Sequence, residues 1–143
     1  MPVVLFVSAS VPTTAANDRT LCFYHTHTTK SECFTFKRGG AFDQGVLKQM
    51  NIFLADWRTH EPTKMDPALF DLLWEVYQDV GATKPYNIVS SYRSPATNAM
   101  LRAKSSGVAE NSQHMSGKAM DVFIPGISLA TLRAAAMRHQ VGG

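Results

Sequence analysis

Residues 112–121 read Ser-Gln-His-Met-Ser-Gly-Lys-Ala-Met-Asp and run directly into the apolar segment Val122-Phe123-Ile124. His114 falls in a polar stretch typical of a loop, and Asp121 opens a run typical of a strand. A loop that folds back onto the start of a strand can bring an imidazole and a carboxylate together, and Gly117 permits the bend between them. Both groups are ordinary zinc ligands. The stretch predicts two of the three protein ligands of a catalytic zinc site; a surface histidine near a strand-capping aspartate explains the same spacing.

Strands and further helices are predicted on both sides of this motif from hydrophobic periodicity and from capping residues. Two strand-like runs, residues 21–24 and 33–36, flank a polar turn and predict a hairpin. Asp121 would begin a strand that continues to Ile124. The other expected elements are a helix that follows Phe42-Asp43 and reaches Trp57, a helix from Asp66-Pro67 to Gly81, a strand over residues 86–90, a helix that begins at Ser94-Pro95 and is closed by Gly107, and a last helix capped by Ser128.

The predicted hairpin carries the two cysteines and two of the five histidines of the chain. Cys22 and Cys33 lie at equal distances from the turn and could face each other across the strands. In an exported protein the pair would form a disulfide, and two small apolar residues packed on one face are the alternative. His25 and His27 could ligate a metal as a His-x-His pair, but solvated histidines at the end of a hairpin are the simpler interpretation.

The composition is that of a single folded domain. The 143 residues are 45% hydrophobic and 17% charged, which excludes a disordered chain. The net charge is +3, and the basic residues are scattered rather than clustered. Nucleic-acid binding would require a basic patch or stripe, so no nucleic acid is expected as a partner. The pattern does not indicate an oligomeric state.

Residues 1–16 are expected to be a secretory signal peptide, in whole or in part. Val3 to Val11 is a mostly apolar run, and Ala15-Ala16 offers a small-residue cleavage site. The run is too short to span a bilayer. No Lys or Arg precedes it, so a first strand over residues 3–7 is the alternative. Residues 17–143 would then be the exported domain, located in the periplasm or the cell envelope.

A second polar segment, Ser91-Tyr92-Arg93-Ser94-Pro95, follows the strand predicted over residues 86–90. Arg93 falls where that strand ends and the next helix begins. A guanidinium at this point can bind a carboxylate or a developing oxyanion through two parallel hydrogen bonds. The structural alternative is an arginine that ties a loop to backbone carbonyls.

The motif resembles the signature Ser-x-His-x-x-Gly-x-Ala-x-Asp of the D-alanyl-D-alanine peptidase-type zinc enzymes, which cut bacterial cell-wall peptides. Over residues 19–143 the order of segments resembles the murein endopeptidase K-like group of these enzymes. The His-Thr-containing hairpin and the Tyr-Arg-Ser segment belong to this resemblance. All five specified positions of the signature are met, by Ser112, His114, Gly117, Ala119 and Asp121.

The resemblance implies both a fold and a reaction. The fold would be α+β, of the hedgehog/D,D-peptidase type, with helices packed on one face of a small antiparallel sheet. The reaction would be zinc-dependent hydrolysis of stem or cross-link peptides of peptidoglycan, in cell-wall remodelling. His114 and Asp121 would bind Zn²⁺, and Arg93 would be the catalytic residue that holds a peptide carboxylate or oxyanion. A general base is also needed, and the sequence does not identify one.

In the murein endopeptidase K-like group, strands follow the position of Gly142-Gly143, and one carries the third zinc-binding histidine. Residues 17–143 are therefore expected to form an incomplete zinc peptidase domain without the C-terminal strands, a form that the missing ligand could leave inactive. A non-catalytic peptidoglycan-binding remnant and a plain structural α+β domain are the alternatives. None of the other histidines is expected to replace the third ligand: His25, His27, His60 and His139.

Overall fold

The computed structural model describes residues 17–105, 107–109 and 112–139, so the expected signal peptide, residues 1–16, lies outside the described residues. A mostly antiparallel sheet is combined with helices, which confirms the α+β class. No helix of the described part is long and apolar enough to cross a membrane. The elements are β1 (Arg19–His25), β2 (Ser31–Arg38), β3 (Ala41–Phe42), α1 (Gln44–Phe53), α2 (Pro67–Asp79), β4 (Tyr86–Ser90), α3 (Pro95–Lys104), the 3-10 helix η1 (Gln113–Ser116), β5 (Asp121–Phe123) and α4 (Leu129–His139).

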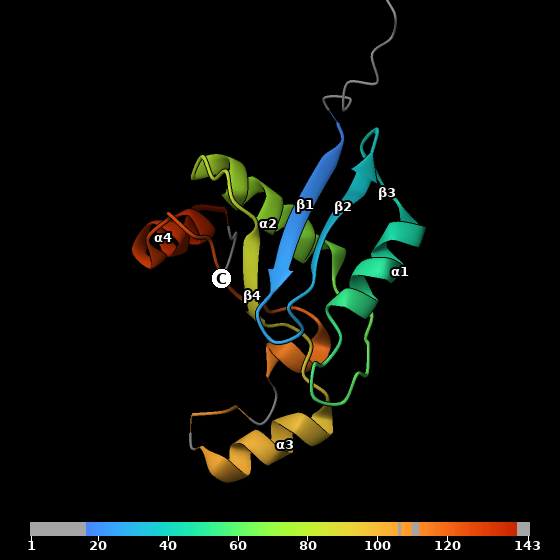
Figure 1. The fold of residues 1–143 in the computed structure, drawn as a ribbon, viewed down its shortest axis with the longest axis vertical. Coiled ribbons are helices and arrows are strands. Elements are labelled where there is room, and N and C mark those ends of the chain that lie inside the picture. The colour runs from blue at the N-terminus through green and yellow to red at the C-terminus, as the bar shows by residue number, and fades with distance from the viewer. Residues whose placement is uncertain (1–16, 106, 110–111, 140–143) are drawn as a thin grey trace, which may run out of the picture.

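The strands form a five-stranded sheet in the order β3-β2-β1-β4-β5 (Figure 1). The β1–β2, β2–β3 and β4–β5 pairs are antiparallel, as expected, but β1 and β4 are parallel. The expectation of a wholly antiparallel sheet is therefore wrong in this pair. Two parallel strands require a long crossover connection, and here the segment containing α1 and α2 carries the chain back to begin β4.

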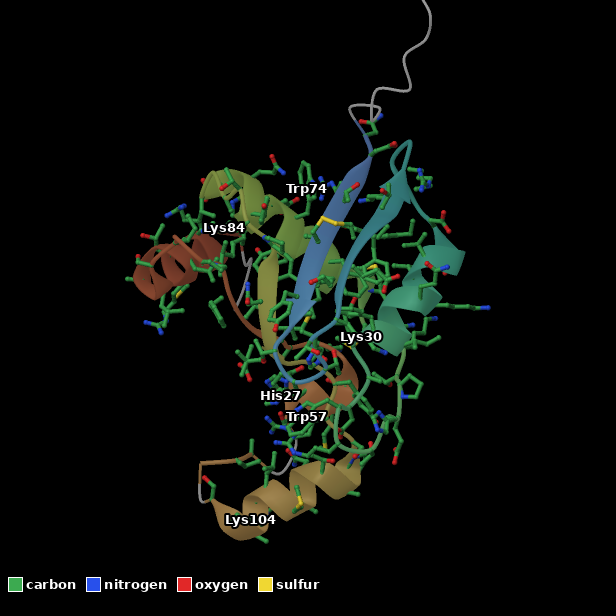
Figure 2. All side chains as sticks on the ribbon, viewed as in Figure 1. His27, Lys30, Trp57, Trp74, Lys84 and Lys104 are labelled. Atoms are coloured by element: carbon green, nitrogen blue, oxygen red, sulfur yellow. A yellow bond between two sulfur atoms is a disulfide. The ribbon has the colours of Figure 1, made fainter. Side chains whose placement is uncertain are left out.

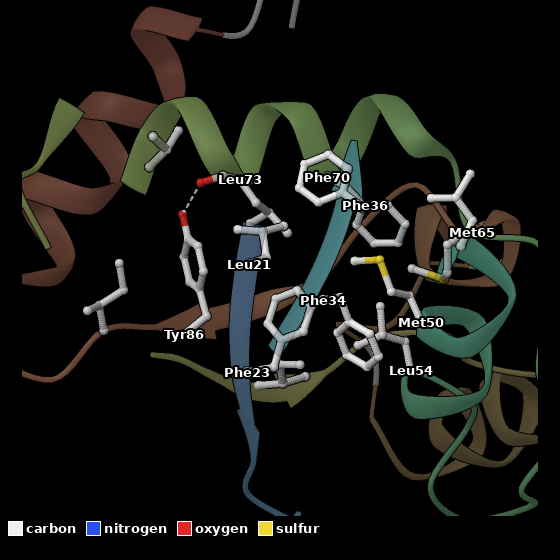
Figure 3. Close-up of a cluster of buried hydrophobic side chains, with 14 of the residues drawn as sticks. Leu21, Phe23, Phe34, Phe36, Met50, Leu54, Met65, Phe70, Leu73 and Tyr86 are labelled. Carbon is white, nitrogen blue, oxygen red and sulfur yellow. Dashed lines mark hydrogen bonds between the residues drawn. The ribbon is translucent and has the colours of Figure 1, made fainter. Parts of the chain in front are cut away.

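One face of the sheet carries the hydrophobic core. Leu21 and Phe23 of β1 are buried and alternate with Cys22 on the opposite face. Figure 3 shows these side chains packed against α1 and α2. The hydroxyl of the buried Tyr86 donates a hydrogen bond of 2.7 Å to the Leu73 carbonyl, and burial raises the pKa of this phenol. The other large buried core residues are Phe34, Phe36, Met50, Leu54, Met65, Phe70, Ile88 and Ile124.

The first helix ends earlier than the hydrophobic pattern predicts. It stops at Phe53, with Leu54 as its C-cap, and does not reach Trp57. In a continued helix the Leu54 carbonyl would accept a hydrogen bond from the Arg58 amide. Instead it accepts one of 2.7 Å from the Ser91 hydroxyl, and the Arg58 amide donates to Asp56 Oδ1 at 2.9 Å. Tertiary hydrogen bonds thus replace the last turn.

The other helix boundaries follow the capping residues of the sequence. The side chains of Asp43, Asp66 and Ser94 accept backbone hydrogen bonds at the N-termini of α1, α2 and α3. Ser128 does the same for α4, where its hydroxyl accepts from the Thr131 amide at 3.1 Å. The C-terminus of α3 differs from the prediction, because this helix ends at Lys104, before Gly107 is reached.

The two cysteines form a disulfide on the face of the sheet away from the core. Cys22 and Cys33 are direct partners in the β1–β2 register, with their Cα atoms 4.0 Å apart. The alternative of two reduced, packed cysteines is therefore not what the structure shows. The bond closes the hairpin across a sequence separation of 11 residues.

Replacing Cys22 and Cys33 together by alanine is expected to lower the free energy of unfolding by about 3 kcal/mol, because the cross-link reduces the entropy of the unfolded chain. Urea unfolding should show a lower midpoint for the double variant. The reduced wild-type protein should unfold with the variant's midpoint. An unchanged midpoint would mean that the bond does not contribute to stability.

Candidate metal and substrate site

His114 lies in the short 3-10 helix η1, which falls between α3 and β5 in the chain. Ser112 caps this helix, and its hydroxyl accepts a hydrogen bond from the His114 amide at 3.2 Å. Gly117 ends the helix in the left-handed conformation, at φ 69°. The serine and the glycine of the motif therefore have structural roles, namely to start and to stop the turn that presents the imidazole.

The structure brings His114 and Asp121 together. Asp121 is the first residue of β5 and pairs with Ser90 of β4. Its Oδ2 atom lies 3.3 Å from His114 Nε2. On the other side of the ring, His114 Nδ1 lies 2.8 Å from the Ser91 carbonyl oxygen. A carbonyl can only accept, so Nδ1 carries the hydrogen, and Nε2 of a neutral imidazole presents a lone pair to the carboxylate.

This arrangement fits a bound cation. Two lone-pair atoms 3.3 Å apart repel each other unless a proton or a metal ion lies between them. Two ligand atoms of a tetrahedral zinc are about 3.4 Å apart, given zinc–ligand distances of about 2.0–2.2 Å. The Asp121 side chain is 61% exposed and that of His114 is 13% exposed, so the pair is covered on the histidine side and open to solvent on the aspartate side. The residues therefore fit zinc.

The described residues do not supply a third ligand to this pair. Within residues 17–105, 107–109 and 112–139, no group of three His, Cys, Asp or Glu side chains gathers closely enough to hold a metal. His139 lies with α2 instead, 3.2 Å from Asp79. His25 is buried in β1, where burial and then the nearby His27 lower the pKa of its imidazole. That neither His139 nor His25 is a ligand stays a prediction.

Arg93 lies next to the pair. Its backbone amide donates a hydrogen bond of 3.0 Å to the His114 carbonyl. Its guanidinium donates to Asn98 Oδ1 of α3 at 3.0 Å, and its buried Nε has no hydrogen-bond partner among the described residues. Among the described residues, the side chain is thus held by a carboxamide and not by the backbone carbonyls that the structural alternative required. Its role in binding substrate stays a prediction, as do the metal-binding roles of His114 and Asp121.

The sequence did not indicate the residue that fixes this turn, Asp56. Its side chain is buried, and its Oδ2 accepts a hydrogen bond from the Ser94 amide at 2.9 Å. Burial alone raises the pKa of this carboxyl, but hydrogen bonds from Ser94, Thr97 and Arg58 outweigh that effect, so the pKa is lowered. Asp56 therefore locks the loop after α1 onto the Arg93-Ser94 turn. It lies in an irregular loop, where neither periodicity nor a motif marks it.

Asp56→Asn is expected to destabilise the fold by about 2 kcal/mol at pH 7, because the buried amides would lose a charged acceptor. A lowered pKa contributes stability above the unfolded-state value near 4, and this contribution is lost as the pH falls through the folded-state value. The difference between variant and wild type should therefore shrink below pH 4 in urea titrations. Glu61→Gln, at an exposed carboxylate, is the control and should show no difference at either pH.

Gly117 is expected to resist substitution for two reasons. Its φ of 69° disfavours any side chain, and a Cβ would lie 3.0 Å from Met65 Cα and 3.1 Å from the Lys64 carbonyl oxygen. Gly117→Ala should lower the free energy of unfolding by about 3 kcal/mol. Gly81 has a φ of 64°, but a Cβ there would meet no atom within 4 Å. Substitution at Gly81 therefore measures the cost of the left-handed backbone conformation without the cost of a steric clash. Gly81→Ala should cost about 1 kcal/mol, and equal losses would show that the contact is unimportant.

Comparison with known proteins identifies the family. The family described as Peptidoglycan L,D-endopeptidase MepK matches residues 13–143. Peptidoglycan L,D-endopeptidase MepK of Escherichia coli strain K12 is 38% identical over 143 residues, which is 100% of this chain and 76% of that protein. The probable peptidoglycan L,D-endopeptidase MepK of Haemophilus influenzae is 34% identical over 126 residues, 87% of this chain and 68% of that protein. No solved structure matches the chain. The chain belongs to the peptidoglycan L,D-endopeptidase MepK family.

Proposed function

We propose that this chain is a zinc-dependent endopeptidase that hydrolyses peptide cross-links of peptidoglycan. The observation that carries the proposal is the His114–Asp121 pair, with 3.3 Å between Nε2 and Oδ2 and the imidazole tautomer fixed by the Ser91 carbonyl. Membership of a family of peptidoglycan endopeptidases supports the reaction class and the substrate.

The chain's own residues would bind the metal, orient its histidine ligand and bind the substrate. His114 and Asp121 would hold the zinc, which when bound supplies a Lewis acid for the scissile carbonyl and activates water. The Ser91 carbonyl keeps the lone pair of His114 directed toward the metal. Arg93 would bind a substrate carboxylate or the developing oxyanion through terminal guanidinium N–H groups that are not bonded to Asn98.

A location in the periplasm or cell envelope agrees with the proposed peptidoglycan substrate. A disulfide between Cys22 and Cys33 is typical of proteins in oxidising compartments such as the periplasm. We propose that residues 1–16 direct export, that residues 17–143 form the peptidase domain, and that it acts in the periplasm or cell envelope. The net charge of +3 favours association with the carboxylates of stem peptides.

Incubation with purified muropeptides tests the proposal. The protein with added zinc should convert cross-linked dimers to monomers, with mass spectrometry identifying an L,D bond as the one cleaved. A chelator should stop the reaction, and added zinc should restore it. Binding to intact sacculi without any cleavage, at saturating zinc, would contradict the proposal and support a non-catalytic binding protein.

A further inference from the structure

A pocket of about 410 Å³ lies between the β1–β2 turn and the C-terminal end of α1, outside the metal and substrate site. Its volume is in the range of roughly 300–1,000 Å³ that is typical of small-ligand sites. The β1–β2 turn forms one side, and the end of α1 with the loop after it forms the other. Its lining includes Lys30, Glu32, Gln49, Phe53, Asp56 and Trp57.

The Trp57 indole is held rigidly in the wall of this pocket. The His27 ring stacks on it with centroids 4.0 Å apart and an interplanar angle of 7°, and the Arg58 guanidinium carbon lies 4.2 Å from the same centroid. Two groups this close to one centroid must cover opposite faces of the ring, so the indole presents its edge to the pocket. The edge of an aromatic ring is electropositive and attracts carbonyl oxygens. Figure 2 shows His27 and Trp57 side by side.

Carboxylates outnumber lysines in the pocket. Lys30 and Glu32 both line it, and the Asp56 carboxylate, which also lines it, accepts hydrogen bonds from the Ser94 and Arg58 amides. The remaining lining is apolar, such as Phe53, or neutral and polar, such as Gln49. An anionic ligand is therefore disfavoured, whereas Glu32 can accept and Lys30 can donate hydrogen bonds to hydroxyl groups. A neutral ligand with hydroxyl groups, a carbonyl and a methyl group matches these surroundings, and an N-acetylated sugar combines all three.

The loop that lines the pocket is hydrogen-bonded to the segment that carries the metal and substrate site. Trp57 follows Asp56, whose Oδ2 lies 2.9 Å from the Ser94 amide. Arg93 precedes Ser94, and its amide lies 3.0 Å from the His114 carbonyl. A peptide of three residues spans at most about 10 Å. A short stem peptide attached to a sugar in the pocket could therefore extend toward the His114–Asp121 pair.

We propose that this pocket binds an N-acetylated sugar of the glycan strand, and so positions the attached peptide for cleavage. The inference rests on the proposed function for its biological substrate, but its binding step is independent of catalysis. The Trp57 edge would contact the acetamido carbonyl, Phe53 the acetyl methyl, and Gln49 and Lys30 the sugar hydroxyls.

Titration with di-N-acetylchitobiose tests the binding directly. In ¹⁵N-labelled protein the Trp57 indole resonance should shift and saturate. The Trp74 indole is an internal control, because it lies at the opposite end of the molecule beside Arg19, 4.3 Å from that guanidinium (Figure 2). No shift at Trp57, or equal shifts at both indoles, would overturn the proposal.

Substrates with and without the sugar test the consequence for hydrolysis. Gln49→Ala should raise KM for disaccharide-bearing muropeptides roughly threefold to tenfold with kcat unchanged, and should leave hydrolysis of sugar-free cross-linked peptides unaltered. Lys48→Ala is the matched control. Lys48 is exposed and precedes Gln49 in the chain, but its side chain lines a different groove. Equal effects of Gln49→Ala on both substrates would overturn the subsite. If the wild type cleaves neither, the proposed function fails and the titration decides the subsite alone.

Discussion

His114→Ala is expected to abolish stoichiometric zinc binding and to lower kcat/KM for cross-linked muropeptides by roughly 1,000-fold or more. The variant removes one of the two ligand atoms of the proposed metal site, His114 Nε2 and Asp121 Oδ2. Loss of an outer partner of a metal ligand alone typically costs 10–100-fold, so loss of the ligand should cost more. Zinc content is measured by atomic emission after dialysis, and activity by chromatography of the muropeptides.

His139→Ala controls for the loss of a histidine. The imidazole of His139 lies on α4 and contacts Asp79 of α2 at 3.2 Å. This variant should keep wild-type zinc content and activity. Retained zinc and activity in His114→Ala would exclude the proposed role of the motif, whereas the same loss in both variants would point to a general effect on folding.

Arg93→Ala is expected to lower kcat/KM by roughly 100-fold while zinc content stays at the wild-type level. The loss follows because a guanidinium that stabilises a substrate carboxylate or oxyanion contributes to the transition state and not to metal binding. Arg93→Lys should recover little of the activity, since an ammonium group cannot form two parallel hydrogen bonds. The measurement is steady-state hydrolysis with zinc added in excess.

Arg133→Ala is the control for charge, because Arg133 is an exposed arginine of α4. It should leave kcat/KM unchanged. If Arg93→Ala lost its zinc, the Arg93 side chain would have to be regarded as a support for the turn that presents His114, since alanine keeps the backbone hydrogen bond to the His114 carbonyl. If Arg93→Lys were fully active, a simple positive charge would be sufficient and the bidentate role would be wrong.

Most of the fold could be predicted from local signals in the sequence. The caps at Asp43, Asp66 and Ser94 and the hairpin with Cys22 opposite Cys33 are all present in the structure. The predictions failed where tertiary contacts decide. The parallel pairing of β1 with β4 depends on where the chain re-enters the sheet after α1 and α2. Helix α1 ends at Phe53 because the hydroxyl of Ser91, far along the sequence, donates a hydrogen bond to the Leu54 carbonyl.

The candidate site was predictable only in part, for a similar reason. The spacing of His114 and Asp121 indicated a pair, and the structure places the two side chains within reach of one ion. Asp56 and Asn98 contact Ser94 and Arg93, and neither was indicated by the sequence. Asp56 lies in an irregular loop 38 residues before Ser94, and Asn98 lies on a helix where no motif marks it. The family itself was identified from the motif, and the comparisons confirm it.

Anomalous diffraction at the zinc absorption edge, from crystals grown with zinc, would test the metal site most directly. We predict one strong peak about 2.0–2.2 Å from both His114 Nε2 and an Asp121 carboxylate oxygen. A peak bound to other residues, or no peak near this pair at saturating zinc, would contradict the proposal that the two side chains hold a catalytic metal.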